Sequence, residues 1–196
     1  MRSARGWQAG KAHDAQRRKR ENKRYTPREF SMKRKYWILL IVFLGIIVLD
    51  QSTKLIIQQT LPLHNKVEII SGFFNLIHVR NAGGAFGIFG GEKGPVGSVL
   101  FVVASLIAVG ILVILFLRVK EHEKTLAFSL SLLLSGAVGN LIDRVCYGEV
   151  VDFLDFHVSS IHWPAFNIAD SAISIGIGLM ALELLIKERK KPGKSH

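Results

Sequence analysis

The sequence predicts an all-α membrane protein, a bundle of four transmembrane helices that carries a small β-rich subdomain outside the membrane. Three observations lead to this fold class. Of the 196 residues, 49% are hydrophobic and only 21% are charged, which is too apolar for an ordinary soluble domain. The apolar residues are concentrated in four long segments. The connection at 58–93 is rich in β-branched, aromatic and glycine residues instead.

The four apolar segments are each long enough to cross the hydrocarbon core of a bilayer. They comprise residues 36–57, 94–117, 125–142 and 167–186. As a helix the first would span about 33 Å, and a bilayer core is about 30 Å thick. The second and third contain no charged residue, and the fourth contains only Asp170 and Glu183. We therefore expect a membrane domain over residues 36–187.

The strong positive charge of the chain belongs to its N-terminal segment. Residues 1–35 contain 13 Lys and Arg against 3 Asp and Glu, whereas the remainder is nearly balanced. Such a segment, poor in aliphatic residues, is predicted to be disordered and to lie against anionic lipid. The same distribution argues against a nucleic-acid-binding fold. A short basic tail is expected at 188–196.

Lys and Arg in the short connections predict the orientation of the helices. Basic residues precede the first segment, fill the connection between the second and third, and follow the fourth. Both termini should therefore be cytoplasmic. The connections at 58–93 and 143–166 should face outward, and the first should contain two to four short strands, chiefly within 67–79.

With this orientation, acidic residues from distant parts of the sequence meet at the outer membrane boundary. Asp50, Asp143 and Asp170 lie near the outer ends of their helices, and Asp152 and Asp155 lie in the connection between the last two. Ionisable groups at such positions are costly and usually functional. Two neighbouring carboxyl groups share a proton, so that one acts as a general base and the other as a general acid. This is the chemistry of an aspartic peptidase, although spacing alone does not select the pair.

Other chemistries have weaker support in the sequence. The single cysteine, Cys146, excludes an internal disulfide framework, and neither an HExxH zinc motif nor a Walker phosphate loop is present. We expect no metal and no cofactor. A proton- or cation-coupled transporter would use the same acidic residues, but they leave no relay across the membrane midplane. A lipid-modifying enzyme would be expected to show a phosphate or metal signature.

Five blocks of sequence together resemble one family. DQSTK (50–54), NAGGAF (81–86), GNLIDR (139–144), VVDF (150–153) and FNIAD (166–170) occur in the order found in the lipoprotein signal peptidases, also called signal peptidase II. The resemblance covers roughly residues 36–187. It implies a four-helix aspartic peptidase of the bacterial inner membrane. The implied reaction removes the signal peptide from diacylglyceryl-modified prolipoproteins, immediately before the lipid-bearing cysteine.

The resemblance also implies the roles of individual residues. The catalytic pair would be Asp152 from VVDF and Asp170 from FNIAD, and Asp155 would be incidental. The implied supporting residues are Asp50, Lys54, Asn81, Gly83, Asn140, Asp143, Arg144, Asn167 and Ala169. The residues alone leave two roles open: Asp50 and Lys54 suit a structural ion pair or a substrate contact, and Arg144 suits a lipid phosphate or a neighbouring carboxylate. The expected partners are a lipidated prolipoprotein and membrane lipid, with the enzyme acting as a monomer.

Overall fold

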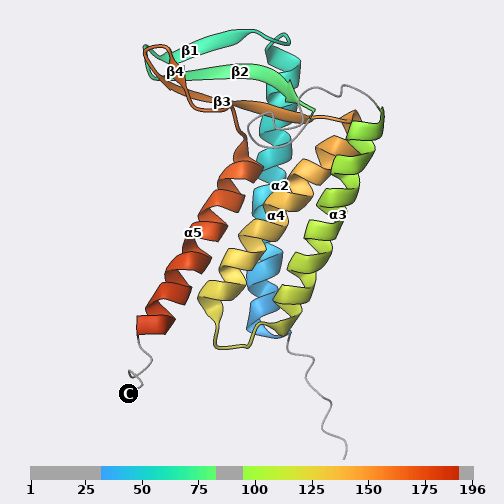
Figure 1. The fold of residues 1–196 in the computed structure, drawn as a ribbon, viewed down its shortest axis with the longest axis vertical. Helices are drawn as coiled ribbons and strands as arrows, with labels where there is room; N and C mark the ends of the chain where they lie inside the picture. The colour runs from blue at the N-terminus through green and yellow to red at the C-terminus, as the bar shows by residue number, and fades with distance from the viewer. Residues whose placement is uncertain (1–31, 83–94, 190–196) are drawn as a thin grey trace, which may run out of the picture. The chain divides into compact units, whose positions relative to one another are not determined.

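The computed structural model describes residues 32–82 and 95–189, and four long helices dominate them (Figure 1). The helices are α2 (Arg34–Thr60), α3 (Pro95–Arg118), α4 (Lys124–Tyr147) and α5 (Ile168–Arg189). Each is long and apolar enough to cross a membrane. The four predicted segments are therefore confirmed as helices. Of the predicted N-terminal extension over residues 1–35, residues 1–31 lie outside the described residues.

Helix α4 is the centre of the bundle. It contacts α2, α3 and α5, and half of its 24 residues are buried. Phe116 in the last turn of α3 and Val119, just after this helix, pack against Ala127, Leu130 and Leu133 of α4. The other three helices leave many large apolar side chains exposed. A helix that is apolar on all sides suits a lipid environment, so the exposed surface agrees with four membrane spans.

Two glycines allow the backbones of α4 and α5 to approach closely. A Cβ atom on Gly136 would overlap the carbonyl oxygen of Ala169, and one on Gly176 would lie 2.9 Å from the carbonyl oxygen of Ser129. Small residues at such positions allow close packing of helices where lipid provides no hydrophobic drive. The contact fixes the start of α5 against α4.

The helices carry a four-stranded antiparallel sheet at one end. The strands are β1 (Lys66–Ile70), β2 (Phe74–Asn81), β3 (Val150–Val158) and β4 (Ile161–His162), and they lie in the order β1-β2-β3-β4. The strands expected in the first outer connection are confirmed as β1 and β2. Strands β3 and β4 were not predicted, and they come from the connection between α4 and α5. The β-rich part is thus built from both connections.

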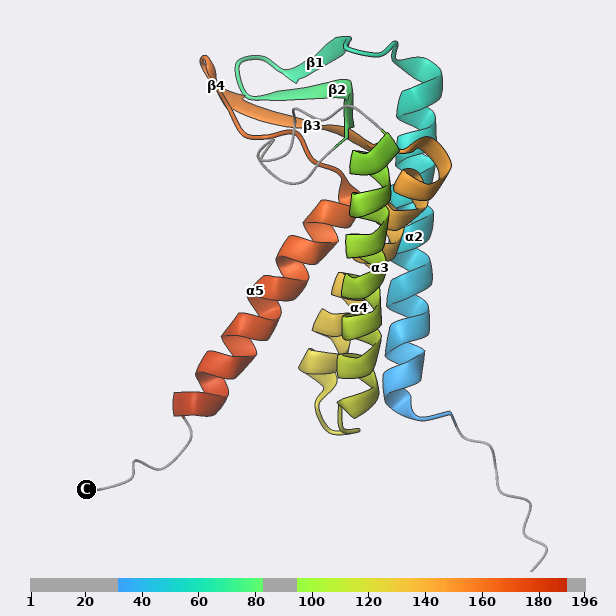
Figure 2. The ribbon, with the colours of Figure 1, turned by 45° about the vertical axis from the view of Figure 1, so that its right-hand side comes forward.

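The chain enters and leaves the sheet beside three helix ends. Helix α2 runs into β1, α4 runs into β3, and β4 leads into α5, whereas the connection from α3 to α4 lies at the opposite end (Figure 2). Ile57 of α2 packs with Val151 and Phe153 of β3 to form a second apolar core. The polar ends of three helices therefore meet directly beneath β3.

The first helix begins slightly before the predicted boundary. Arg34 and Lys35, assigned to the N-terminal extension by the sequence, belong to α2. Lys35 is buried, and its Nζ donates to the carbonyl oxygens of Leu117 at 3.1 Å and Val119 at 2.7 Å. Cations are stabilising at helix C-termini, where carbonyl groups lack partners. Lys35 therefore ties the start of α2 to the end of α3.

Candidate active site

Asp152 lies on β3 with both carboxylate oxygens hydrogen-bonded. Its Oδ1 accepts from Asn167 Nδ2 at 2.7 Å, and its Oδ2 accepts from Asn81 Nδ2 at 3.1 Å. Only 2% of the residue is exposed. The two amides come from β2 and from the residue before α5, so the carboxylate orientation depends on three separate segments.

Asp170 lies in the first turn of α5, where it takes part in a helix cap. Asn167 precedes the helix, and its Oδ1 accepts from the backbone N–H of Asp170 at 2.9 Å. In return Asp170 Oδ2 accepts from the backbone N–H of Asn167 at 3.3 Å. This reciprocal pair is a capping box, formed here by the N-I-A-D sequence. The other oxygen, Oδ1, accepts from Asn140 Nδ2 at 2.8 Å.

Asn167 links the two carboxylates. Its Nδ2 donates to Asp152 Oδ1 and lies 3.2 Å from Asn140 Oδ1, while its backbone and Oδ1 cap the turn that holds Asp170. Asn167 is fully buried. Because one residue contacts both carboxylates, it fixes the position of each relative to the other.

Both carboxylates line one pocket of about 510 Å³. Its walls come from β2, β3, α4, α5 and the segment 163–166. The lining residues are Asn81, Asn140, Arg144, Val150, Asp152, Trp163, Pro164, Ala165, Phe166, Asp170, Ser171, Ile173, Ser174 and Ile175. Apolar side chains thus surround a small group of polar ones, which is typical of a binding pocket.

The surroundings of Asp152 favour its protonated form. Burial raises its pKa from the ordinary value of 3.8 to about 7, and the negative charge of Asp170 acts in the same direction. Hydrogen bonds from Asn81 and Asn167 oppose the rise but do not cancel it. A pKa close to neutrality allows a carboxyl group to both accept and release a proton at physiological pH.

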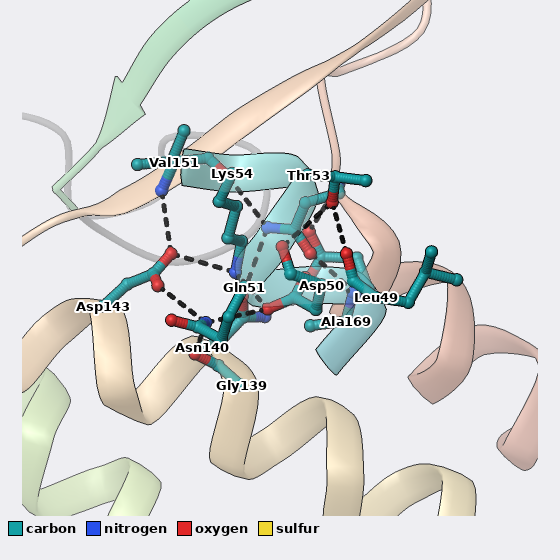
Figure 3. Close-up of polar contacts among 12 residues, drawn as sticks. Leu49, Asp50, Gln51, Thr53, Lys54, Gly139, Asn140, Asp143, Val151 and Ala169 are labelled. Atoms are coloured by element: carbon teal, nitrogen blue, oxygen red, sulfur yellow. Dashed lines mark hydrogen bonds and ion pairs between the residues drawn. The ribbon is translucent and has the colours of Figure 1, made fainter. Parts of the chain in front are cut away.

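A buried lysine, Lys54, contacts Asn140 of the pocket wall, and Figure 3 shows the polar groups around it. Lys54 Nζ lies 2.8 Å from Asp50 Oδ2, 2.9 Å from Asp143 Oδ2 and 3.1 Å from Asn140 Oδ1. We call the group formed by Lys54, Asp50 and Asp143 the lysine cluster. All three residues are essentially inaccessible to solvent. An ammonium group has three N–H donors, and each has an acceptor here. Asp50 and Lys54 therefore form an ion pair, one of the two roles that the sequence left open.

The two carboxylates of this cluster also hold the backbone beside the proposed pair (Figure 3). Asp143 Oδ2 accepts from the N–H of Val151 at 3.1 Å, and Asp50 Oδ1 accepts from the N–H of Ala169 at 2.9 Å. Val151 directly precedes Asp152, and Ala169 directly precedes Asp170. The lysine cluster thus positions both segments that carry the pocket carboxylates.

Gln51 is a further member of this cluster that the sequence analysis did not single out. Its Nε2 lies 3.0 Å from Asp50 Oδ2, 3.1 Å from Asp143 Oδ1 and 3.2 Å from the carbonyl oxygen of Gly139. Gly139 leaves room for the cluster, since a Cβ atom there would lie 2.8 Å from Asp50 Oδ2. Its position inside the DQSTK block is the sequence feature that could have identified Gln51.

The structure brings together the described residues that the sequence proposed for the site. Asn81, Asn140, Arg144, Asp152 and Asp170 line the pocket. Directly behind it lie Asp50, Lys54, Asp143, Asn167 and Ala169. Gly83 falls outside the described residues.

The guanidinium of Arg144 contacts the backbone of α4 one turn before it. Its Nη1 donates to the carbonyl oxygen of Asn140 at 3.4 Å, and its guanidinium lies 6.0 Å from the ring centre of Phe101. The contact leaves the guanidinium along the wall of the pocket that holds Asp152 and Asp170. Arg144 therefore brings a positive charge beside two carboxyl groups.

The sequence and the fold both resemble those of known proteins. The family model described as signal peptidase (SPase) II matches residues 42–186. The lipoprotein signal peptidase of Geobacter sulfurreducens is 41% identical over 160 residues, which cover 82% of this chain and 99% of the relative. That of Desulforapulum autotrophicum is 47% identical over 151 residues, which cover 76% and 93%. A solved bacterial membrane enzyme structure superposes with a TM-score of 0.71 at 34% identity, covering 81% of this chain and 93% of the other.

Proposed function

The chain belongs to the signal peptidase II family, the lipoprotein signal peptidases, and on this premise we propose that Asp152 and Asp170 are its catalytic pair. The observation that carries the proposal is their arrangement. The two carboxylates line the same pocket, and Asn167 holds both of them. The pKa of Asp152 near 7 agrees with a pair that shares one proton at neutral pH.

The reaction that suits this pair is hydrolysis of a peptide bond by an activated water molecule. The ionised carboxylate removes a proton from water while the oxygen attacks the carbonyl carbon. The protonated carboxyl donates a hydrogen bond to the carbonyl oxygen. Breakdown of the tetrahedral intermediate breaks the C–N bond, and a proton from the pair passes to the leaving amine. The products are a new carboxyl terminus and a free amino terminus.

The location of the pocket favours a substrate that is anchored in the bilayer. Both Asp152 and Asp170 lie where the helices meet the sheet, and we place this end at the outer leaflet. A prolipoprotein with a diacylglyceryl-modified cysteine is held by its acyl chains and its apolar signal helix. Its scissile bond, immediately before that cysteine, would therefore lie close to the headgroup level. Apolar pocket residues such as Ile173 suit such a substrate.

Family membership favours this function over a transporter. The charges point the same way: the lysine cluster pairs Asp50 and Asp143 internally, which leaves Asp152 and Asp170 as the acidic residues among the described residues that line the pocket. We further propose that the enzyme acts as a monomer, with its whole pocket built from one chain.

Replacing either aspartate tests the proposal. In purified protein, Asp152→Asn and Asp170→Asn should each lower the rate of signal-peptide release from a lipidated precursor by about 10³-fold or more, because one carboxyl cannot perform both proton transfers. The reaction should be run with excess chelator, which should leave the wild type active. A requirement for a divalent metal would point to a lipid-modifying enzyme.

Asp155→Asn is the matched control on the same strand. Asp155 lies three residues beyond Asp152 on β3 and is not among the residues that line the pocket. In chelator this variant should cleave at close to the wild-type rate. Full activity in Asp152→Asn or Asp170→Asn would refute the catalytic assignment, and a loss confined to Asp155→Asn would show that the wrong strand carboxylate had been chosen.

A further inference from the structure

Three potential metal ligands gather on the sheet, away from the catalytic pocket. Asp155 and His157 lie on β3, and His162 lies on β4. One ligand atom from each residue lies within 4.8 Å of the other two. Alternation along a strand places Asp155 and His157 on the same face of β3. None of the three lines the pocket.

The register of β3 and β4 explains why the two histidines meet. His157 and His162 are direct cross-strand partners. The adjacent pair is hydrogen-bonded, since the N–H of Trp163 donates to the carbonyl oxygen of Phe156 at 2.8 Å. Pairs alternate along an antiparallel ladder, so the histidines occupy a non-hydrogen-bonded position, where side chains lie closest. Their rings stack with centres 4.8 Å apart and planes 10° apart.

The carboxylate of the cluster is held in place from beneath. Asp155 is 5% exposed, and its Oδ2 accepts from Nδ2 of buried Asn75 at 2.8 Å. Its Oδ1 lies 2.9 Å from His162 Nδ1. The two contacts give Asp155 a fixed orientation, which is what a metal ligand requires.

We propose that Asp155, His157 and His162 form a binding site for a divalent transition metal such as Zn²⁺. Two imidazoles and one carboxylate suit this class of ion, with ligand distances of about 2.0–2.2 Å. Small rotations of the histidine side chains would place all three ligand atoms at that distance from one ion. The side chain of His162 is 50% exposed and has room to rotate. Water would complete the coordination.

A bound ion would brace the hairpin formed by β3 and β4. The chain continues from His162 directly into residues 163–166, which form one wall of the catalytic pocket. It then reaches Asn167, which holds both proposed catalytic carboxylates. The proposed metal ligands do not line the pocket. The metal would act indirectly, by stabilising the hairpin that leads into the pocket wall.

The test is a titration of the purified, tag-free, metal-stripped full chain with Co²⁺, whose visible absorption reports coordination by protein ligands. We expect one Co²⁺ per chain, displaced by one equivalent of Zn²⁺. His157→Ala, His162→Ala and Asp155→Asn should each weaken Co²⁺ binding about tenfold or more. Zn²⁺ should also raise the Tm of the wild type, because it binds only the folded hairpin, and should not raise that of His162→Ala.

His122→Ala provides the matched control, since His122 is an exposed histidine at the opposite end of the helices. It should bind Co²⁺ as the wild type does. Equal weakening in His122→Ala, or wild-type binding no tighter than in the His157→Ala/His162→Ala double variant, would overturn the proposal. Circular dichroism and Tm without metal verify folding of each variant. If His157→Ala fails to fold, Co²⁺ binding by His162→Ala decides the result, because the His162 side chain is half-exposed.

Discussion

Lys54 positions the proposed catalytic residues without lining the pocket. Its ammonium group forms ion pairs with Asp50 and Asp143, and those two carboxylates hold the backbone next to each proposed catalytic aspartate. A buried ion pair contributes little net stability when compared with apolar residues of similar volume, but breaking it by removing one partner costs about 3–5 kcal/mol. The value of this cluster therefore lies in the geometry that it imposes.

Titration of Asp152 should appear in the stability of the protein. Its pKa of about 7 in the folded state exceeds the ordinary value of 3.8, so the folded state holds the proton more tightly than the unfolded chain. Stability must then fall as the pH rises between these two values, by about 4 kcal/mol at most, of which on the order of 2–3 kcal/mol falls between pH 5 and 8. Asp152→Asn removes this contribution. The Tm of the wild type minus that of Asp152→Asn should be larger at pH 5 than at pH 8.

Gly178→Ala serves as the control for this measurement. The substitution changes no titratable group, and nothing lies within 4 Å of the added atom. The Tm difference between the wild type and Gly178→Ala should therefore be nearly the same at pH 5 and at pH 8. A Tm difference for Asp152→Asn that is equally constant would contradict the raised pKa.

Sequence motifs proposed residues that the structure brings together, but they did not predict the contacts among those residues. The i, i+4 spacing placed Asp50 and Lys54 on one face, but only the fold shows Asp143 completing their cluster. Gln51 was missed because a neutral amide beside charged residues carries little signal in a sequence. The proximity of His157 and His162 could not be predicted, because it depends on the register of β3 and β4.

At the level of elements, helices were easier to predict than strands. A membrane helix forms all its backbone hydrogen bonds within one segment, so length and hydropathy are sufficient to identify it. Strand β3 pairs with β2, which lies about 70 residues earlier, and its first four residues are all buried. It therefore lacks the alternating pattern that marks a half-buried strand. Strand β4 has only two residues and depends on β3.

The packing of α4 against α5 provides a prediction at this scale. Gly176→Ala should lower the stability by about 1–3 kcal/mol, because the added methyl group would lie 2.9 Å from the backbone oxygen of Ser129 and from a side-chain carbon of Leu133. Gly178→Ala, two residues along the same helix, should be neutral, since nothing lies within 4 Å of the added atom. Thermal unfolding in detergent compares the two variants. Equal Tm values would contradict close packing at Gly176.

The whole molecule has two chemically different ends. The sheet and the proposed catalytic pair lie at one end of the helices. The connection between α3 and α4 lies at the other, and Arg118, Lys120 and Lys124 are found there. Short connections rich in Lys and Arg remain in the cytoplasm. The charge distribution therefore predicts that the pocket faces the outer leaflet and that both termini are cytoplasmic.

Cysteine labelling in intact spheroplasts tests this orientation, and the single native cysteine makes it simple. In a Cys146→Ala background, Ser160→Cys places a thiol in the exposed turn between β3 and β4, and Glu121→Cys places one in the exposed connection between α3 and α4. A membrane-impermeant maleimide should label the first in intact spheroplasts and the second only after lysis. The reverse pattern would put Asp152 and Asp170 on the cytoplasmic side. A precursor whose mature part lies outside the membrane could not then reach the pair, so the same experiment decides whether the pocket and its proposed substrate can meet.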